Sequence, residues 1–99
     1  MMDMEEMILV NDFCTHHSIS YTFISKLCDA ELIEVAIVEE QQYLKQEQMD
    51  FLEKLVNLHT ELDINTAGVE AIAHMLLRIE AMQEEMKLLR QRLYLYEGE

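Results

Sequence analysis

The chain is poor in cations, cysteines and long apolar runs, and each shortage excludes a class of protein. Its 99 residues carry 7 lysines and arginines against 20 aspartates and glutamates, a formal net charge of −13. Such a surface repels phosphate backbones and anionic lipids. Two cysteines cannot form a disulfide framework. No apolar run approaches the roughly 20 residues of a membrane span. We therefore expect no membrane partner and disfavour nucleic acid.

The amino-terminal segment reads MMDMEEMILV. It is acidic where a secretory signal is basic, and its apolar run is short. Cys14 and Cys28 both lie in apolar helical patterns, which predicts buried free thiols. Together these features lead us to expect a reducing, cytoplasmic location.

The negative charge is unevenly distributed. Residues 1–63 contain 14 acidic and 3 basic residues, a net charge of −11, whereas residues 64–99 have a net charge of −2. An acidic first half suits a basic protein partner. The same charge could also serve solubility alone, and that alternative stays open.

The last third of the chain has the sharpest pattern. From Gly68 it reads GVEAIAHMLLRIEAMQEEMKLLRQRLYLYEGE, without proline and without glycine until Gly98. Apolar residues recur at alternating steps of three and four over about four heptads, which predicts a coiled-coil helix of roughly 30 residues. Such a narrow seam needs a partner helix, so we expect a homodimer. The seam residues are Ile72, Met75, Ile79, Met82, Met86, Leu89, Leu93 and Tyr96.

Helix caps and turn residues divide the first part of the chain into short elements. Asn11 is a good helix cap and predicts a short helix over 12–18. Ser20 predicts a second capped helix over 21–32. The apolar run 7–10 is compatible with a strand or with the lead-in to the first helix. Two short helices joined by a tight turn indicate a helix-turn-helix.

A small β-wing and a third helix follow the helix-turn-helix. The β-branched run 33–38 predicts a strand, 39–42 a turn and 43–44 the returning strand. A third helix is expected over 47–62, and the long helix begins near Thr66. The predicted apolar stripe of the third helix comprises Phe51, Leu52, Leu55, Val56, His59 and Leu62.

The predicted fold is mainly α, a winged helix-turn-helix with a small β-wing and a long C-terminal helix. Residues 1–63 would form the helix-turn-helix domain with its third helix, and residues 64–99 the dimerisation helix. The long helix could instead pack partly on its own domain through Leu76 and Leu77.

The chemistry-bearing residues do not predict DNA binding, a metal site or catalysis. The second helix offers Lys26, followed by Asp29 and Glu31, which is the wrong sign for gripping phosphate. Cys14, His16, His17 and Cys28 could be imagined as a metal site, but they lack zinc-ligand spacing, and the first three diverge on one short helix. There is no Ser-His-Asp set and no glycine-rich phosphate loop. We expect no enzyme activity, no metal and no cofactor.

The segment 58–93, LHTELDINTAGVEAIAHMLLRIEAMQEEMKLLRQRL, resembles the C-terminal region of the bacterial chaperone modulator CbpM family. The likeness rests on LDIN-x-x-G-V-E-x-I, LL-x-R-I and the closing LLRQRL. DFCTHHSIS and ELIEV extend it more loosely toward the amino terminus. That family is related to the MerR-type winged-helix regulators.

The resemblance implies a MerR-like fold and a non-enzymatic adaptor. CbpM-like proteins bind the J-domain of a DnaJ-like co-chaperone, CbpA, and block its stimulation of a DnaK-type chaperone. MerR-type DNA binders carry Y-R-x-Y after the wing, whereas this chain has QQYLKQEQM, with Tyr43 and no arginine. A MerR-like transcriptional regulator and a generic coiled-coil adaptor remain the alternatives.

A J-domain docks on its chaperone through a basic helical surface, which an acidic binder could cover. The candidate partner-binding residues follow from charge around the wing and the third helix. They are Glu31, Glu34, Glu39, Glu40, Glu47, Asp50 and Glu53. The alternative is that these acids form a solvated face.

Overall fold

A short strand leads directly into the first helix in the computed structural model, which describes residues 6–97. Strand β1 spans Met7–Leu9 and helix α1 spans Val10–His17. The predicted cap at Asn11 was wrong, because Leu9 occupies the cap position and makes no side-chain capping bond. Leu9 still pairs with Tyr43 in the sheet, so no loop residue separates strand from helix.

Helix α2, Tyr21–Asp29, completes the helix-turn-helix. The hydroxyl oxygen of Ser20 accepts from the backbone N–H of Phe23 at 3.3 Å, which confirms the predicted cap. The expected extension of this helix to residue 32 was wrong. Glu31 adopts a positive φ of 61°, which ends helical geometry and turns Leu32 into the core.

The wing consists of strands β2, Val35–Val38, and β3, Gln41–Lys45. Strand β3 lies between β1 and β2 and pairs antiparallel with both. The turn is two residues long rather than four, and the returning strand is correspondingly longer than predicted. Glu39 and Glu40 have φ values of 52° and 66°. Two successive positive φ values are typical of a type I′ hairpin turn, which usually needs asparagine and glycine.

A 3-10 turn, Gln46–Gln48, precedes helix α3, Met49–Thr60. The predicted helix over 47–62 was therefore too long at both ends. Leu52, Leu55 and Val56 are buried as expected, but Leu62 lies beyond the helix and is 64 % exposed. His59 stacks on Phe23 with ring centroids 4.6 Å apart, and its Nδ1 lies 2.8 Å from the carbonyl oxygen of Ile64.

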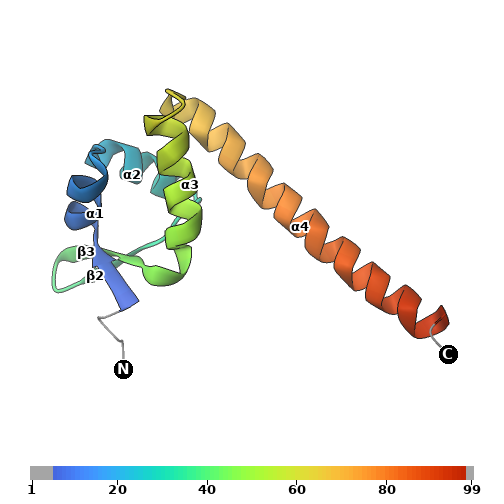
Figure 1. The fold of residues 1–99 in the computed structure, drawn as a ribbon. Helices are drawn as coiled ribbons and strands as arrows, with labels where there is room; N and C mark the ends of the chain where they lie inside the picture. The colour runs from blue at the N-terminus through green and yellow to red at the C-terminus, as the bar shows by residue number, and fades with distance from the viewer. Residues whose placement is uncertain (1–5, 98–99) are drawn as a thin grey trace.

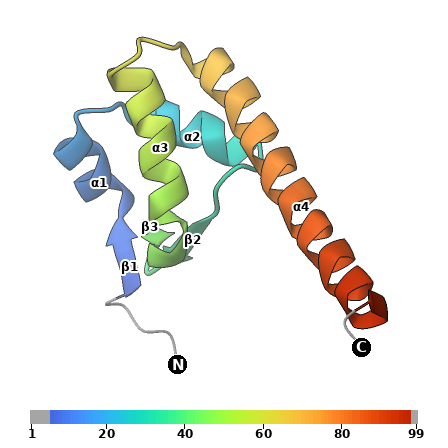
Figure 2. The same ribbon diagram turned by 45° about the vertical axis from the view of Figure 1, so that its right-hand side comes forward.

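Helix α4, Thr66–Glu97, starts in the core and then projects from it. Its Val69 and Ala73 are fully buried against the domain, so the core continues past residue 63. Figures 1 and 2 both show the rest of α4 extending away from the other elements. The fold is mainly helical, with a three-stranded sheet and a long C-terminal helix, which confirms the predicted winged helix-turn-helix class.

Candidate interaction surfaces

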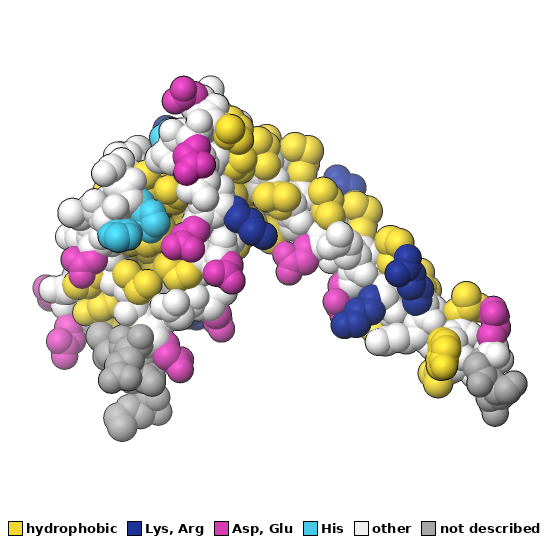
Figure 3. Space-filling view, viewed as in Figure 1, with side chains coloured by type: hydrophobic (Ala, Val, Ile, Leu, Met, Phe, Trp, Pro, Cys, Tyr) yellow, Lys and Arg dark blue, Asp and Glu magenta, His cyan; other side chains and the backbone are white. Residues whose placement is uncertain are grey.

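The seven acidic candidates are all exposed, but the fold separates them into three groups. Glu31 and Glu34 precede strand β2. Glu39 and Glu40 form the wing tip. The third group lies at the start of α3 and comprises Glu47, Asp50 and Glu53. On the face shown in Figure 3, acidic side chains are spread over the domain, while lysines and arginines gather along α4.

Glu34 belongs to a local network. Its carboxylate accepts from the ammonium group of Lys45 at 3.3 Å. The side chain of Gln48 accepts from the backbone N–H of Glu34 at 3.0 Å and donates to its carbonyl oxygen at 2.6 Å. An exposed ion pair of this kind adds little stability. The amide clamp, by contrast, ties the entrance of β2 to the start of α3.

The surface that would face DNA in a helix-turn-helix protein carries almost no positive charge. Lys26 is the single lysine or arginine between Tyr21 and Asp29. Tyr21 donates from its hydroxyl group to the side-chain oxygen of Gln42 at 2.7 Å, which links α2 to the wing. The wing tip presents Glu39 and Glu40 where phosphate contacts would require cations.

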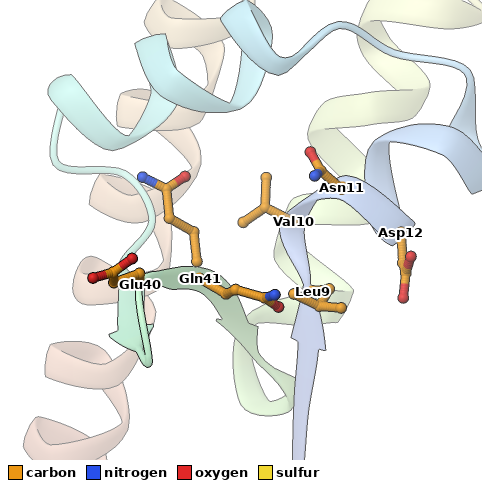
Figure 4. A pocket seen from close by; sticks show the side chains of 7 residues that line it. Leu9, Val10, Asn11, Asp12, Glu40 and Gln41 are labelled. Atoms are coloured by element: carbon orange, nitrogen blue, oxygen red, sulfur yellow. The ribbon is translucent and has the colours of Figure 1, made fainter.

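A cleft of about 390 Å³ lies between the wing tip and the start of α1. Figure 4 shows the cleft lined by Leu9 to Asp12 on one side and by Glu40 and Gln41 on the other. Because the chain segments on its two sides are some 30 residues apart, sequence reasoning could not bring them together.

A second cleft lies between α1 and α3. His17 sits inside it, with its ring centroid 4.2 Å from that of Phe13 and its Nε2 3.9 Å from a carboxylate oxygen of Glu53. His16 packs edge-on against His17, with centroids 4.9 Å apart. Asp12 also lines this cleft, although charge around the wing and the third helix did not select it.

The two thiols are free. Cys14 is buried, as predicted, and burial raises its pKa. Cys28 is half-buried, so the expectation of full burial was wrong for this residue. Within residues 6–97, no group of three or more histidine, cysteine, aspartate or glutamate side chains lies close enough to hold a metal ion.

The predicted seam of α4 is open to solvent along most of its length. Ile72 is half-buried against the domain, as is Leu76, whereas Leu77 is 39 % exposed. The other seven seam residues are exposed by 46 % to 87 %; they are Met75, Ile79, Met82, Met86, Leu89, Leu93 and Tyr96. Over the part of the chain that the structure describes, none of the helices is long and apolar enough to cross a bilayer.

These features define a winged helix-turn-helix protein with a projecting C-terminal helix. The chain belongs to the family described as MerR HTH family regulatory protein, which it matches over residues 8–91. No curated protein and no solved structure gives a significant match. The family match spans both the domain and most of α4, in agreement with the fold.

Proposed function

We propose that this protein is a non-enzymatic modulator that acts in the cytoplasm. It would bind the J-domain of a DnaJ-like or CbpA-like co-chaperone and block stimulation of a DnaK-type chaperone. The observation that carries the proposal is the sign of the charge on the helix-turn-helix face. Lys26 is the single lysine or arginine on α2, and Glu39 and Glu40 occupy the wing tip.

The charge favours a basic protein surface over a nucleic acid. Each phosphate contact needs a cation, and residues 1–63 have 14 acids against 3 bases. Lys45, the last residue of the wing strand β3, already pairs with Glu34. A J-domain presents basic helical residues to its chaperone, so an acidic domain suits it. The CbpM-like sequence of residues 58–93 supports the same partner.

The exposed seam of α4 supports a homodimer. Seven of its eight apolar residues are at least 46 % exposed, which leaves a long apolar stripe unpaired in one chain. A second copy carries the same heptad pattern and could cover that stripe. A dimer would present two acidic domains to two co-chaperone molecules.

Family membership supports a second candidate, a MerR-like transcriptional regulator. Its basic surface would have to come from α4, where Arg78, Lys87, Arg90 and Arg92 lie. Retention on heparin at physiological ionic strength would support this candidate. Salt-sensitive, submicromolar binding to a duplex DNA fragment would establish it and contradict the first proposal.

Inhibition of co-chaperone-stimulated ATP hydrolysis tests the proposal. A DnaK-type chaperone is assayed with a J-domain co-chaperone from the same genome, and the protein is titrated in. We expect the rate to fall to the unstimulated value while the basal rate stays unchanged. Unchanged stimulation by every J-domain protein of that genome would refute the proposal. The basal reaction without co-chaperone controls for direct effects on the chaperone.

A further inference from the structure

We infer that the cleft between α1 and α3 is the docking site for a lysine or arginine side chain from a basic partner helix. The inference rests on the proposed function, because it assigns a place on this molecule to the J-domain's basic helix. The sequence suggested acids around the wing and third helix without distinguishing among them. The structure distinguishes them by what lies beside each carboxylate.

The cleft has a volume of about 330 Å³ and two walls. One wall is the exposed side of α1, and the other is the 3-10 turn with the first two turns of α3. Between the walls lies apolar surface, visible in Figure 3 as hydrophobic side chains between the histidines and the acids of the domain. The lining residues from α1 are Asp12, Phe13, His16 and His17, and those from the opposite wall are Gln46, Met49, Asp50 and Glu53.

The floor of the cleft suits the apolar stem of a long cationic side chain. Phe13 and Met49 are 3 % and 6 % exposed, so the core holds them in place, and Ile8 adds a half-buried side chain. Lysine and arginine bury their methylene groups along apolar surface while the charged head remains at a polar rim. The cleft offers that combination of fixed floor and open rim.

The rim supplies charge of one sign. Asp12 stands on one wall, with Asp50 and Glu53 on the other, and all three are exposed. Among the residues that the structure describes, no lysine or arginine lines this cleft. The contact of His17 with Glu53 at 3.9 Å is an ion pair only when the imidazole is protonated. A partner cation would therefore meet carboxylates on both sides without displacing a resident lysine or arginine.

The other acidic groups lack one of these properties. Glu31 and Glu34 lie at a cleft that already contains Lys45, which pairs with Glu34. Glu39 and Glu40 stand on the wing-tip turn, and the cleft beside them has one carboxylate on its wing wall, that of Glu40, so it lacks the pair that Asp50 and Glu53 form. The α1–α3 cleft combines an apolar floor with unopposed carboxylates, so a basic amphipathic helix fits it better than it fits the other two groups.

A pair of charge-matched double variants tests this location in the full-length protein. Asp50→Asn/Glu53→Gln removes two negative charges at the cleft, and Glu39→Gln/Glu40→Gln removes two at the wing tip. Binding of each to a purified J-domain from the same genome is measured by calorimetry at physiological salt. We expect the cleft variant to bind about 10-fold more weakly, because close charge pairs contribute strongly. The wing-tip variant should stay within about 2-fold, because it loses only screened, long-range attraction.

Three outcomes would overturn the inference. Equal weakening of both variants, or weakening of the wing-tip variant alone, would remove the cleft while leaving the proposed function intact. Failure of the unmodified protein to bind any J-domain would remove both. The single variants Asp50→Asn and Glu53→Gln should each also weaken binding; Asp12 lines both clefts and cannot separate them. Thermal unfolding followed by circular dichroism verifies that each variant is folded.

Discussion

The domain and the projecting part of α4 use apolar residues in opposite ways. In the domain, apolar side chains such as Leu27 and Leu52 are fully buried by contacts within the same chain. Along α4 beyond its first turns, residues of the same kind remain half exposed, as Met82 and Leu89 do. A single helix thus begins as part of a completed core and continues with an apolar stripe that is exposed in the single chain.

The transition occurs because α4 carries two apolar stripes that overlap over a few turns. Val69, Ala73 and Leu76 face the domain, and the first two are fully buried. Ile72 and Ile79 belong to the heptad seam, and burial decreases from the first to the second. The helix therefore presents one side to its own core and keeps a different side free. Local packing explains the first stripe, whereas the second is the stripe that we propose a second copy covers.

Removing a core side chain should produce the largest loss of stability. Leu27→Ala deletes a fully buried group between α2 and the rest of the core and should cost about 3 kcal/mol of unfolding free energy. The matched substitution Leu95→Ala, at a residue that is 72 % exposed, should change stability by less than about 0.5 kcal/mol. Urea denaturation measures both. Similar losses would erase the distinction between the two regions.

Placing a charge in the seam should break the assembly without unfolding the domain. Ile79→Glu would bury an unpaired carboxylate in the proposed dimer, at a cost of about 3 kcal/mol or more. That corresponds to a dimer roughly 100-fold weaker. Ala81→Glu adds the same charge away from the seam and serves as the control. Light scattering should report a monomer for the first variant and a dimer for the second. A monomeric unmodified protein would show that the seam does not pair.

The junction between the regions depends on the cap of α4. The side-chain oxygen of Asn65 accepts from the backbone N–H of Gly68 at 2.8 Å. Asn65→Ala should destabilise the protein by about 1 kcal/mol, because an N–H group at the helix start loses its acceptor. Asn65→Asp retains that acceptor and should remain close to the unmodified protein. Chemical denaturation compares the two, and an equal loss in both would contradict the capping role.

The smallest expected change is a gain in stability at the wing tip. Glu40 has a φ of 66°, a left-handed conformation that costs a residue with a side chain about 1 kcal/mol or more. Glu40→Gly should recover roughly 0.5 kcal/mol, because glycine's greater freedom in the unfolded chain offsets part of the relief. Glu40→Ala removes the same charge without relieving the backbone and should give no such gain. Thermal melts of the unmodified protein and the two variants measure these differences in stability.

Features determined by neighbouring residues were predictable from the sequence. Ser20 caps α2 because its hydroxyl group can reach the backbone N–H three residues later. The long helix begins at Thr66, as predicted from the turn-forming and capping residues around it. The heptad spacing also identified which residues of α4 would be apolar along one stripe. The stripe's exposure in one chain follows from the structure, and its pairing stays a prediction.

Features that depend on distant residues were not predictable. The turn at Glu39 and Glu40 lacks the usual residues, and its geometry is imposed by the pairing of Val38 with Gln41. The α1–α3 cleft brings Asp12 within one site with residues almost 40 positions later, a juxtaposition that only the packed core creates. Charge alone selected Asp50 and Glu53 on α3 but not Asp12 on α1, which lines the same cleft; the role of all three stays a prediction.

The most direct measurement of the central claim is light scattering of the full-length protein during size-exclusion chromatography with a purified J-domain. The account predicts one peak whose mass equals two protomers of 11.7 kDa plus two J-domains. In that complex α4 would join the protomers, and each acidic domain would hold one J-domain. If the two proteins instead elute separately at their own masses, at concentrations well above those in a cell, the account is wrong.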